Sequence, residues 1–124
     1  MLPRDPDESA VQLKVRLDQR YSAELGVVIS DSVGRAWRNG VVGLALGCSG
    51  LKPLTDLRGQ PDRDGRPLNV TLVGVADQIA AAAALLMGEA AEGQPVVLIR
   101  GLEWEPSLQN AAALIRPTEQ DMFR

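Results

Sequence analysis

The sequence predicts an α+β fold with a mainly antiparallel sheet, and three observations lead to this class. The length of 124 residues and the apolar fraction of 45% are those of one globular domain. The periodic segments follow the order helix, two strands, strand, helix, strand, which indicates α+β with antiparallel pairing. A hairpin-type turn signal, "RDGR" at 63–66, precedes a β-branched run and favours the same pairing.

The first helix is predicted from its capping residues. Asp5 is expected as the N-cap, Pro6 suits the first helical position, and Glu8 stands three residues after the cap. A strand-like alternation follows at Val11, Leu13, Val15 and Leu17. Because the capping residues outweigh this alternation, we expect a helix to about Tyr21 that caps the sheet.

Strands are expected in the middle of the chain. Residues 25–30 are predicted to form a short buried strand that delivers "SDSVGR" to its C-terminal end. Residues 41–46 are predicted to form a second strand or extended segment, in which Gly43 permits close backbone approach. A turn-rich loop follows at 53–68, and residues 69–75 are the best strand candidate of the chain.

A second helix is expected after this strand. Asp77 is predicted to cap "QIAAAAALLM" at 78–87, which is apolar on nearly all sides and is therefore expected to be one buried Ala-rich helix. Gly88 is expected to end it. Residues 95–101, "PVVLIRG", are predicted to form a strand, and a short helix is expected after Pro106.

Composition excludes several kinds of catalytic and metal site. The sequence has no histidine, which removes serine–histidine and cysteine–histidine nucleophiles, histidine general bases and almost every zinc site. Cys48 is the only cysteine, so it has no partner for a disulfide within the chain. We expect it to be packed, in a reducing compartment.

Charge and hydropathy restrict the partners. Thirteen basic and sixteen acidic residues give a net charge of −3, which argues against nucleic acid and anionic membranes as partners. The N-terminus is acidic where a signal peptide would be basic, and the longest apolar run, 79–87, is too short to cross a membrane. These features predict a cytoplasmic protein.

The basic residues are concentrated in the centre of the chain. Residues 35–66 contain six basic and three acidic residues, and seven of the twelve glycines lie between 34 and 65. A small anionic ligand approached closely by the backbone fits both facts. A glycine-rich loop with solvated arginines fits them as well.

The stretch "ISDSVGRAWRNG" is the strongest candidate site. Asp31 and Ser32 offer neighbouring oxygen ligands of the kind that magnesium and manganese prefer and share with phosphate. Arg35 and Arg38 suit the neutralisation of phosphoryl charge. We interpret the stretch as a metal–phosphate site, although an Asp-Ser turn with two surface arginines is the more common origin of this spacing.

Three further features have a structural and a functional interpretation. Trp37, between the two arginines, is interpreted as a packing residue, with lining of the site as the alternative. The charges of "RGQPDRDGR" at 58–66 are interpreted as solvating a loop and pairing locally. Glu89, after the second helix, is either a solvated loop residue or a second metal ligand.

Three long, ordered stretches carry a family resemblance: "VVISDSVGRAWRNGVVGLALG", "GLKPLTDLRGQPDRDGRPLNVTLVGVADQIAAAAALLMG" and "PVVLIRGL". Together they resemble the coenzyme F-420:L-glutamate ligase family, also described as F-420-0 gamma-glutamyl ligases. The resemblance runs from about Leu2 to Arg124 and corresponds to the C-terminal half of the family's ligase domain. It implies that residues 1–124 are part of a larger α+β ligase fold, without its N-terminal half, and that the protein forms an intertwined homodimer.

The resemblance also implies a reaction. Members of the family use GTP and a divalent metal, Mn²⁺ or Mg²⁺, to join L-glutamate to the deazaflavin coenzyme precursor, and K⁺ is a further candidate cofactor. The precursor's carboxylate is activated as an acyl phosphate, the glutamate amine attacks it, and GDP and phosphate are released. Positive charge and metal stabilise the phosphoryl group during its transfer.

The resemblance assigns roles to residues of this sequence. Asp31 matches the metal-binding aspartate and Ser32 the adjacent hydroxyl residue, which is often threonine. The loop that contacts nucleotide and the second metal falls on Met87, Gly88, Glu89 and Ala90, with Glu89 as the metal ligand. Arg35 and Arg38, as catalytic residues, and Asn39, as a cofactor-binding residue, sit in the matching motif, and their anion-binding roles are our inference.

The departures from the family pattern are modest, and one alternative function remains. "SDSVGRAW" stands where "SDTFGRPW" is common and keeps the types of ligating atom, while "VADQ" stands where "VADE" is common. Because the N-terminal half holds another metal aspartate, we do not expect residues 1–124 to be active alone. The alternative is a non-catalytic α+β module, derived from the ligase, that binds a partner chain.

Overall fold

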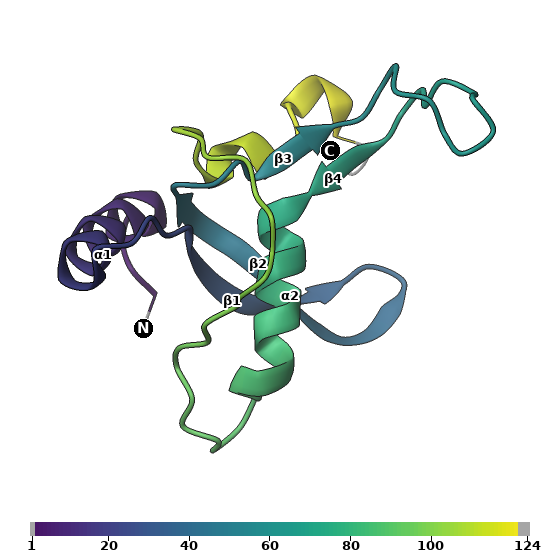
Figure 1. Ribbon diagram of the computed structural model, residues 1–124. Helices are drawn as coiled ribbons and strands as arrows, with labels where there is room; N and C mark the ends of the chain where they lie inside the picture. The colour runs from purple at the N-terminus through teal and green to yellow at the C-terminus, as the bar shows by residue number, and fades with distance from the viewer. Residues whose placement is uncertain (1, 122–124) are drawn as a thin grey trace.

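The computed structural model describes residues 2–121 and has the predicted α+β class (Figure 1). Its elements are, in chain order, α1 (Pro6–Tyr21), β1 (Val27–Arg35), β2 (Arg38–Ser49), β3 (Leu54–Asp56), β4 (Leu72–Gly74) and α2 (Val75–Met87), then the 3-10 helices η1 (Ala111–Leu114) and η2 (Thr118–Gln120). The described strands form two antiparallel pairs, β1 with β2 and β3 with β4. The β1–β2 hairpin lies at the centre, and α2 crosses it.

The capping residues begin α1 as predicted. The side chain of Asp5, the N-cap, accepts a hydrogen bond from the backbone N–H of Glu8 at 2.9 Å, and the helix continues to Tyr21. The alternating apolar residues therefore lie on a helix, where Val11 and Leu13 are 43% and 45% exposed. A satisfied cap outweighs a strand-like period over this stretch.

An unpaired residue within β2 determines which residues of this strand face each side of the hairpin. On β1, Ile29 and Ser30 are consecutive. Their partners on β2, Gly47 and Ala45, are two residues apart, so one residue of β2 has no partner. Because side chains alternate between the two faces of a strand, the extra residue reverses the alternation. Gly43 and Gly47 consequently face opposite sides.

These two glycines let both helices approach the hairpin closely. A Cβ on Gly43 would lie 2.6 Å from the carbonyl oxygen of Ala80 in α2, and a Cβ on Gly47 would lie 2.3 Å from the carbonyl carbon of Pro6 in α1. Both neighbours are backbone atoms that no rotamer change can move. The close approach that we predicted at Gly43 is therefore confirmed as packing against α2.

The carboxylate of Asp7 joins three segments that are distant in the sequence. Its Oδ1 accepts hydrogen bonds from the backbone N–H of Cys48 in β2, at 2.9 Å, and from that of Ala111 in η1, at 3.0 Å. These donors are 41 and 104 residues away from Asp7. One oxygen atom therefore fixes the start of α1, the end of β2 and η1 to one another.

Asp77 has a similar role, and its predicted capping role is wrong. The helix begins earlier, at Val75, with Gly74 as an N-cap that makes no side-chain hydrogen bond. Asp77 lies in the first turn of α2 and accepts a hydrogen bond from the backbone N–H of Ala45 at 2.9 Å. Its carboxylate ties α2 to β2 instead of closing the helix end.

The buried core is small and consists mostly of small side chains: Ala10, Cys48, Leu51, Ala76, Ala80 and Ala111. The Ala-rich helix α2 is buried on one face only, since Leu85 is 86% exposed and Leu86 is 62% exposed, so the prediction of burial on nearly all sides is wrong. Gly88 ends this helix as predicted. Within residues 2–121, no helix has the length and apolar character needed to span a membrane.

The chain exposes much more surface than a compact protein of its size. Its accessible surface is 9617 Å². A compact monomer of 13.3 kDa exposes roughly 6,400 Å² by the usual scaling of area with mass. The elements are formed, but they are only partly packed against each other.

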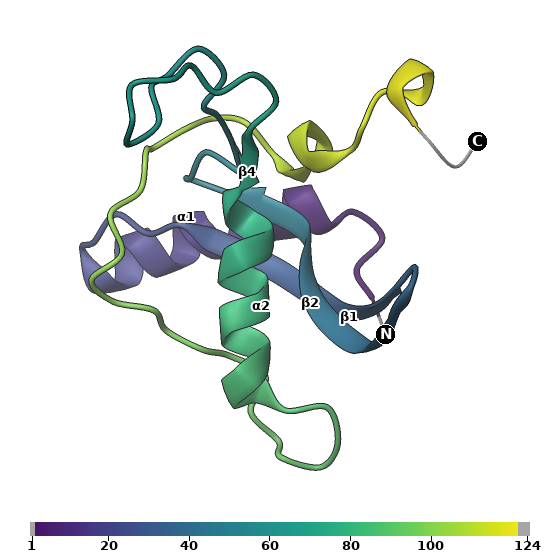
Figure 2. The ribbon, with the colours of Figure 1, turned by 90° about the vertical axis from the view of Figure 1, so that its right-hand side faces the viewer.

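Two strand predictions need correction. Of residues 69–75, only Leu72–Gly74 is a strand, and residues 95–101 form none. Figure 2 shows this last segment within the chain that returns from the end of α2 toward β4. Val96 is 82% exposed and Leu98 is 64% exposed. A β-prone sequence becomes a strand only where a partner strand is available, and the described part of the chain offers none here. The short helix expected after Pro106 is the 3-10 helix η1.

We predict that Asp7→Ala destabilises the protein by about 3 kcal/mol, because it leaves two half-buried backbone N–H groups without an acceptor. Asp7→Asn, which keeps an acceptor oxygen, should cost about 1 kcal/mol. Urea unfolding followed by circular dichroism measures both losses. Glu8→Ala, on the same helix turn but exposed, is the control; an equal loss in Glu8→Ala and Asp7→Ala would contradict the role of Asp7.

We predict that Cys48 is unreactive in the folded protein. Burial, and then the charge of Asp7, raise the pKa of the Cys48 thiol to about 11. At about pH 8 the thiolate fraction is then ~100-fold below that of an ordinary thiol. Alkylation by iodoacetamide, followed by mass spectrometry, should be at least that much slower in buffer than in urea. Equal rates in the two solvents would show that the thiol is not buried.

Candidate functional site

The two predicted metal ligands lie inside β1. The predicted strand stopped before Asp31, but β1 continues through Asp31 and Ser32 to Arg35, so the expected position at a strand end is wrong. In the hairpin, Asp31 is paired with Leu44 and Ser32 with Gly43. The reason for the difference is that β2 is also longer than predicted and offers partners to this whole stretch.

Asp31 and Ser32 point to opposite faces of the hairpin. Consecutive strand residues alternate between faces, and directly paired residues share a face. Gly43 faces α2, so its partner Ser32 faces α2 as well and is half-buried. Asp31 lies on the other face, exposed to solvent. The chain therefore does not direct these two side chains to one point.

Glu89 lies on the same side of the hairpin as Ser32. A small cavity of about 190 Å³ between β2 and the C-terminal part of α2 is lined by Val41, Val42, Gly43, Ala81, Ala84, Leu85 and Glu89. Since Gly43 is the partner of Ser32, the hydroxyl of Ser32 and the carboxylate of Glu89 belong to the α2 side. Asp31 is separated from both by the sheet.

The oxygen donors suit a hard divalent ion in kind, but their number is too small. Mg²⁺ needs six oxygen ligands in nearly octahedral geometry, and Mn²⁺ prefers the same kind of donor. Among residues 2–121, no group of three or more acidic or cysteine side chains is placed to hold a metal ion. The remaining ligands would have to come from phosphate, water and groups outside these residues.

The loop predicted to contact nucleotide begins where α2 ends. Met87 is the last residue of α2, and Gly88, with φ 74°, donates its N–H to the carbonyl of Ala84 at 3.1 Å. Glu92 folds back over this loop and accepts a hydrogen bond from the N–H of Ala90 at 2.8 Å. A Cβ on Gly88 would lie 2.2 Å from the carboxyl carbon of Glu92. The sequence pattern indicates only a solvated loop residue at Glu92, whereas its carboxylate holds this loop through the N–H of Ala90.

The tip of the hairpin carries the predicted catalytic arginines. Arg35 and Arg38 are paired across a two-residue turn and are both exposed, as is Asn39. Trp37 in the turn is 93% exposed, so its interpretation as a packing residue is wrong. Its φ of 64° is in the left-handed region, which costs a bulky residue about 1 kcal/mol. The next positive φ, at Gly40, is on a residue that adopts it freely.

The tip is open to solvent on the side away from α1 (Figure 1). Arg35, Arg38 and Asn39 do not line the cavity beside Glu89. The predicted residues are thus held at three places on one hairpin and helix: the β1 face at Asp31, the α2 side at Ser32 and Glu89, and the tip.

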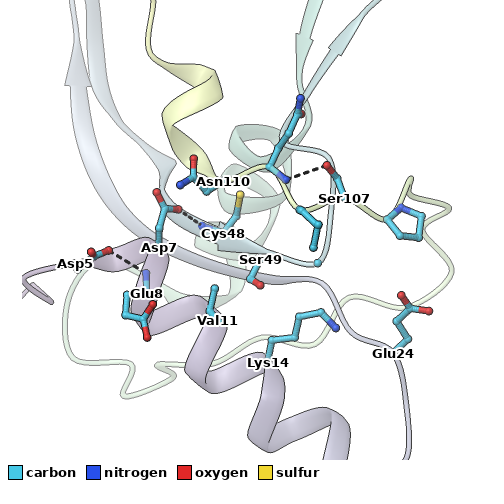
Figure 3. A pocket seen from close by; sticks show the side chains of 14 residues that line it. Asp5, Asp7, Glu8, Val11, Lys14, Glu24, Cys48, Ser49, Ser107 and Asn110 are labelled. Atoms are coloured by element: carbon cyan, nitrogen blue, oxygen red, sulfur yellow. Dashed lines mark hydrogen bonds between the residues drawn. The ribbon is translucent and has the colours of Figure 1, made fainter.

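A larger cavity, of about 770 Å³, lies at the opposite end of the hairpin and contains none of the predicted residues (Figure 3). Carboxylates surround it, but Asp5 and Asp7 already accept backbone hydrogen bonds. Lys14 at its wall is paired with Asp18. We therefore assign this cavity to the packing of α1 and not to a site.

The basic loop after β3 pairs locally, as the structural interpretation of 58–66 requires. Arg58 binds the carboxylate of Asp56, and this hydrogen bonding lowers the pKa of Asp56 to about 2. The side chain of Asp62 accepts hydrogen bonds from the backbone N–H groups of Asp64 and Arg66, each at 2.8 Å. This carboxylate shapes the predicted "RDGR" turn.

The sequence of this hairpin, helix and loop matches a known family. A family model described as F420-0:Gamma-glutamyl ligase matches residues 1–101. The chain belongs to the F420-0:gamma-glutamyl ligase family.

Curated relatives agree with this membership. The chain is 48% identical over 125 residues to the coenzyme F420:L-glutamate ligase of Methanothermobacter thermautotrophicus, which covers 99% of the chain and 50% of that relative. It is 46% identical over 124 residues to that of Methanocaldococcus jannaschii, covering all of the chain and 50% of the relative. The ligase of Methanopyrus kandleri is 45% identical over 130 residues, with 51% of its length covered. The chain spans about half the length of the curated relatives it matches.

We predict that Trp37→Gly stabilises the protein by about 1 kcal/mol, because glycine adopts a positive φ without strain and the exposed indole contributes no packing. Trp37→Ala removes the same ring but keeps a Cβ, and should leave the free energy of unfolding nearly unchanged. Urea denaturation of both variants provides the comparison. Equal effects of glycine and alanine would mean that the backbone at this position is not strained.

Proposed function

We propose that this chain forms the C-terminal half of a ligase domain that joins L-glutamate to a deazaflavin coenzyme F420 precursor, with GTP as co-substrate. The observation that carries the proposal is the family match, together with relatives named coenzyme F420:L-glutamate ligase that are 45–48% identical over nearly the whole chain. In the proposed reaction the precursor's carboxylate attacks the terminal phosphate of GTP and releases GDP. The glutamate amine then attacks the acyl phosphate and releases phosphate.

The placement of the oxygen donors supports two metal positions. Asp31 would bind one divalent ion on the exposed face of β1, and Ser32 and Glu89 would contribute to a second on the α2 side. Bound Mn²⁺ or Mg²⁺ supplies positive charge for the phosphoryl group. Because the strand alternates its side chains, two neighbouring residues can serve two separate positions but not one.

The other predicted residues would bind the nucleotide and the moving phosphoryl group. Arg35, Arg38 and Asn39 form an exposed, cationic hairpin tip that suits an anion. The backbone from Met87 to Ala90 leaves α2 through a positive φ at Gly88 and suits close contact with a nucleotide. K⁺ stays a candidate cofactor for which the described residues offer no separate argument.

A complementary part supplied from outside these residues belongs to the proposal. The chain exposes about one and a half times the surface of a compact monomer, and its metal donors are incomplete within residues 2–121. The half of the relatives that this chain does not match would supply the missing donors and cover the exposed apolar side chains. We propose a homodimer of the completed domain.

Calorimetry tests the metal-linked nucleotide site. We mix the chain with the N-terminal half of the Methanothermobacter relative and titrate GDP in Mn²⁺. Asp31→Asn should weaken the binding at least about 10-fold, because a neutral amide replaces the charged carboxylate ligand of one ion. The same titration in a chelator should weaken binding by the intact protein at least as much, because both proposed ions are removed.

Asp56→Asn is the matched control, since Asp56 is an exposed aspartate paired with Arg58 away from the hairpin. It should bind GDP as the intact chain does. GDP binding that is indifferent to both the chelator and Asp31→Asn would rule out the proposed site. Incorporation of labelled glutamate into the precursor, dependent on GTP and on both halves, then tests the reaction itself.

The second candidate function is a non-catalytic module that binds a partner chain. The large exposed apolar surface favours it, because such surfaces mark interaction sites. Titration of GDP into the complex isolated by size-exclusion chromatography separates the two candidates. A stable complex with the complementary half that binds no nucleotide supports the module, whereas metal-linked GDP binding by the same complex supports the ligase.

A further inference from the structure

We propose that the tip of the β1–β2 hairpin, Arg35 to Arg38, binds a planar aromatic ring that carries phosphate, with Trp37 stacked on the ring and the two arginines contacting the phosphate. This inference deepens the proposed function and rests on it. It gives Trp37 the role of a binding residue, which is the alternative to packing that its position between two arginines indicates.

Trp37 has no structural role among residues 2–121 of the chain. Its side chain is 93% exposed, and its backbone is in the left-handed region that bulky residues avoid. The other tryptophan, Trp104, is less exposed, at 41%, and donates its indole N–H to the carbonyl of Gly50. A large apolar ring held out into solvent at a strained position indicates a surface that something else covers.

The positive charge beside this ring is not balanced. Arg35 and Arg38 are directly opposed across the turn, an arrangement in which like charges repel. Within residues 2–121, neither has an acidic partner, whereas Arg58 of the basic loop is paired with Asp56. An anion placed between the two guanidinium groups would remove the repulsion and form charge-assisted hydrogen bonds.

The tip belongs to a hairpin that strand pairing and helix packing hold in place. Strand pairing extends from Arg35 and Arg38 back to Val27 and Ser49, with two register shifts along the way. Its base is fixed by α2 on one face and by the start of α1 on the other. Figure 1 shows the tip projecting beyond α2, where the chain leaves it uncovered.

The combination of one ring and two cations favours a small ligand over a polymer. The net charge of −3 argues against nucleic acid. An indole stacks on flat heteroaromatic rings, and guanidinium groups bind phosphate in a fork. The guanine nucleotide and the deazaflavin precursor share this chemistry, and the test below distinguishes them.

Trp37 fluorescence provides the test, in a Trp104→Phe chain where it is the only tryptophan. The protein is the full chain mixed with the complementary half of the relative, whose tryptophans are replaced by phenylalanine. The probes are GDP for the nucleotide, FMN for a flavin-like ring with phosphate, and guanosine and inorganic phosphate as the separate parts. If Trp104→Phe fails to fold, the difference between the intact chain and Trp37→Phe gives the same readout.

We expect saturable quenching of Trp37 by GDP or by FMN, and at least about 10-fold weaker binding of guanosine and of phosphate alone. Quenching by GDP alone assigns the tip to the nucleotide, and quenching by FMN alone assigns it to the coenzyme precursor. Arg35→Gln with Arg38→Gln should weaken the binding about 10-fold. Arg63→Gln, an exposed arginine in the basic loop, is the control that should not.

Three results would overturn the inference. Mn²⁺-linked GDP binding with no response to GDP or FMN at Trp37, and with affinity unchanged in Trp37→Gly, would leave the proposed function standing and remove the tip from it. A change in Trp37 fluorescence on mixing the two halves, with none on adding ligand, would make the tip a protein interface. Absence of any nucleotide or flavin binding would remove both the inference and the proposed function.

Discussion

A single carboxylate oxygen, that of Asp7, holds together the parts of this chain that sequence distance separates. It accepts hydrogen bonds from Cys48 at the end of β2 and from Ala111 in η1, so the start of α1, the central hairpin and the C-terminal segment meet at one atom. The carboxylate of Asp77 likewise joins α2 to β2 by accepting a hydrogen bond from the backbone N–H of Ala45. With a core built largely from alanine and one cysteine, apolar burial alone gives little orientation. The directional hydrogen bonds therefore supply much of the order between elements.

The hairpin that these carboxylates fix is also the element that carries the candidate site. An unpaired residue in β2 reverses the facing of its side chains, so Gly43 meets α2 and Gly47 meets α1. The same alternation separates Asp31 from Ser32 and places Ser32 on the side of Glu89. Packing and the placement of the candidate donors are thus consequences of one register. A change of register by one residue would exchange the faces of the proposed metal donors as well as the helix contacts.

Both the surface of the chain and its candidate site contain groups that have no partner within residues 2–121. Apolar residues such as Leu85, Val96 and Leu98 are largely exposed, and the β-prone segment 95–101 has no partner strand within the described residues. The tip residue Trp37 combines exposure with backbone strain. Each of these features is unfavourable for an isolated chain and becomes favourable when a second surface or a ligand covers it. The relatives are about twice as long as this chain, and in our proposal the half that it does not match supplies such a surface.

The sequence by itself determined the elements that depend on local chemistry. Asp5 and Pro6 began α1, Gly88 ended α2, and "RDGR" formed a turn, because caps and turns are satisfied by residues a few positions away. Together with the neighbouring motifs, the stretch "SDSVGRAWRNG" also predicted the family to which the chain belongs.

Only the tertiary structure decided the features that need a distant partner. It showed Asp77 bonded to β2 instead of capping its helix, Asp31 and Ser32 on opposite faces, and Trp37 exposed instead of packed. It also left residues 95–101 without the strand that their composition favours. The physical reason is common to all of these. A cap contacts its own turn, whereas a strand, a face and a buried side chain are defined by what lies opposite them, and the linear order of residues does not specify that neighbour.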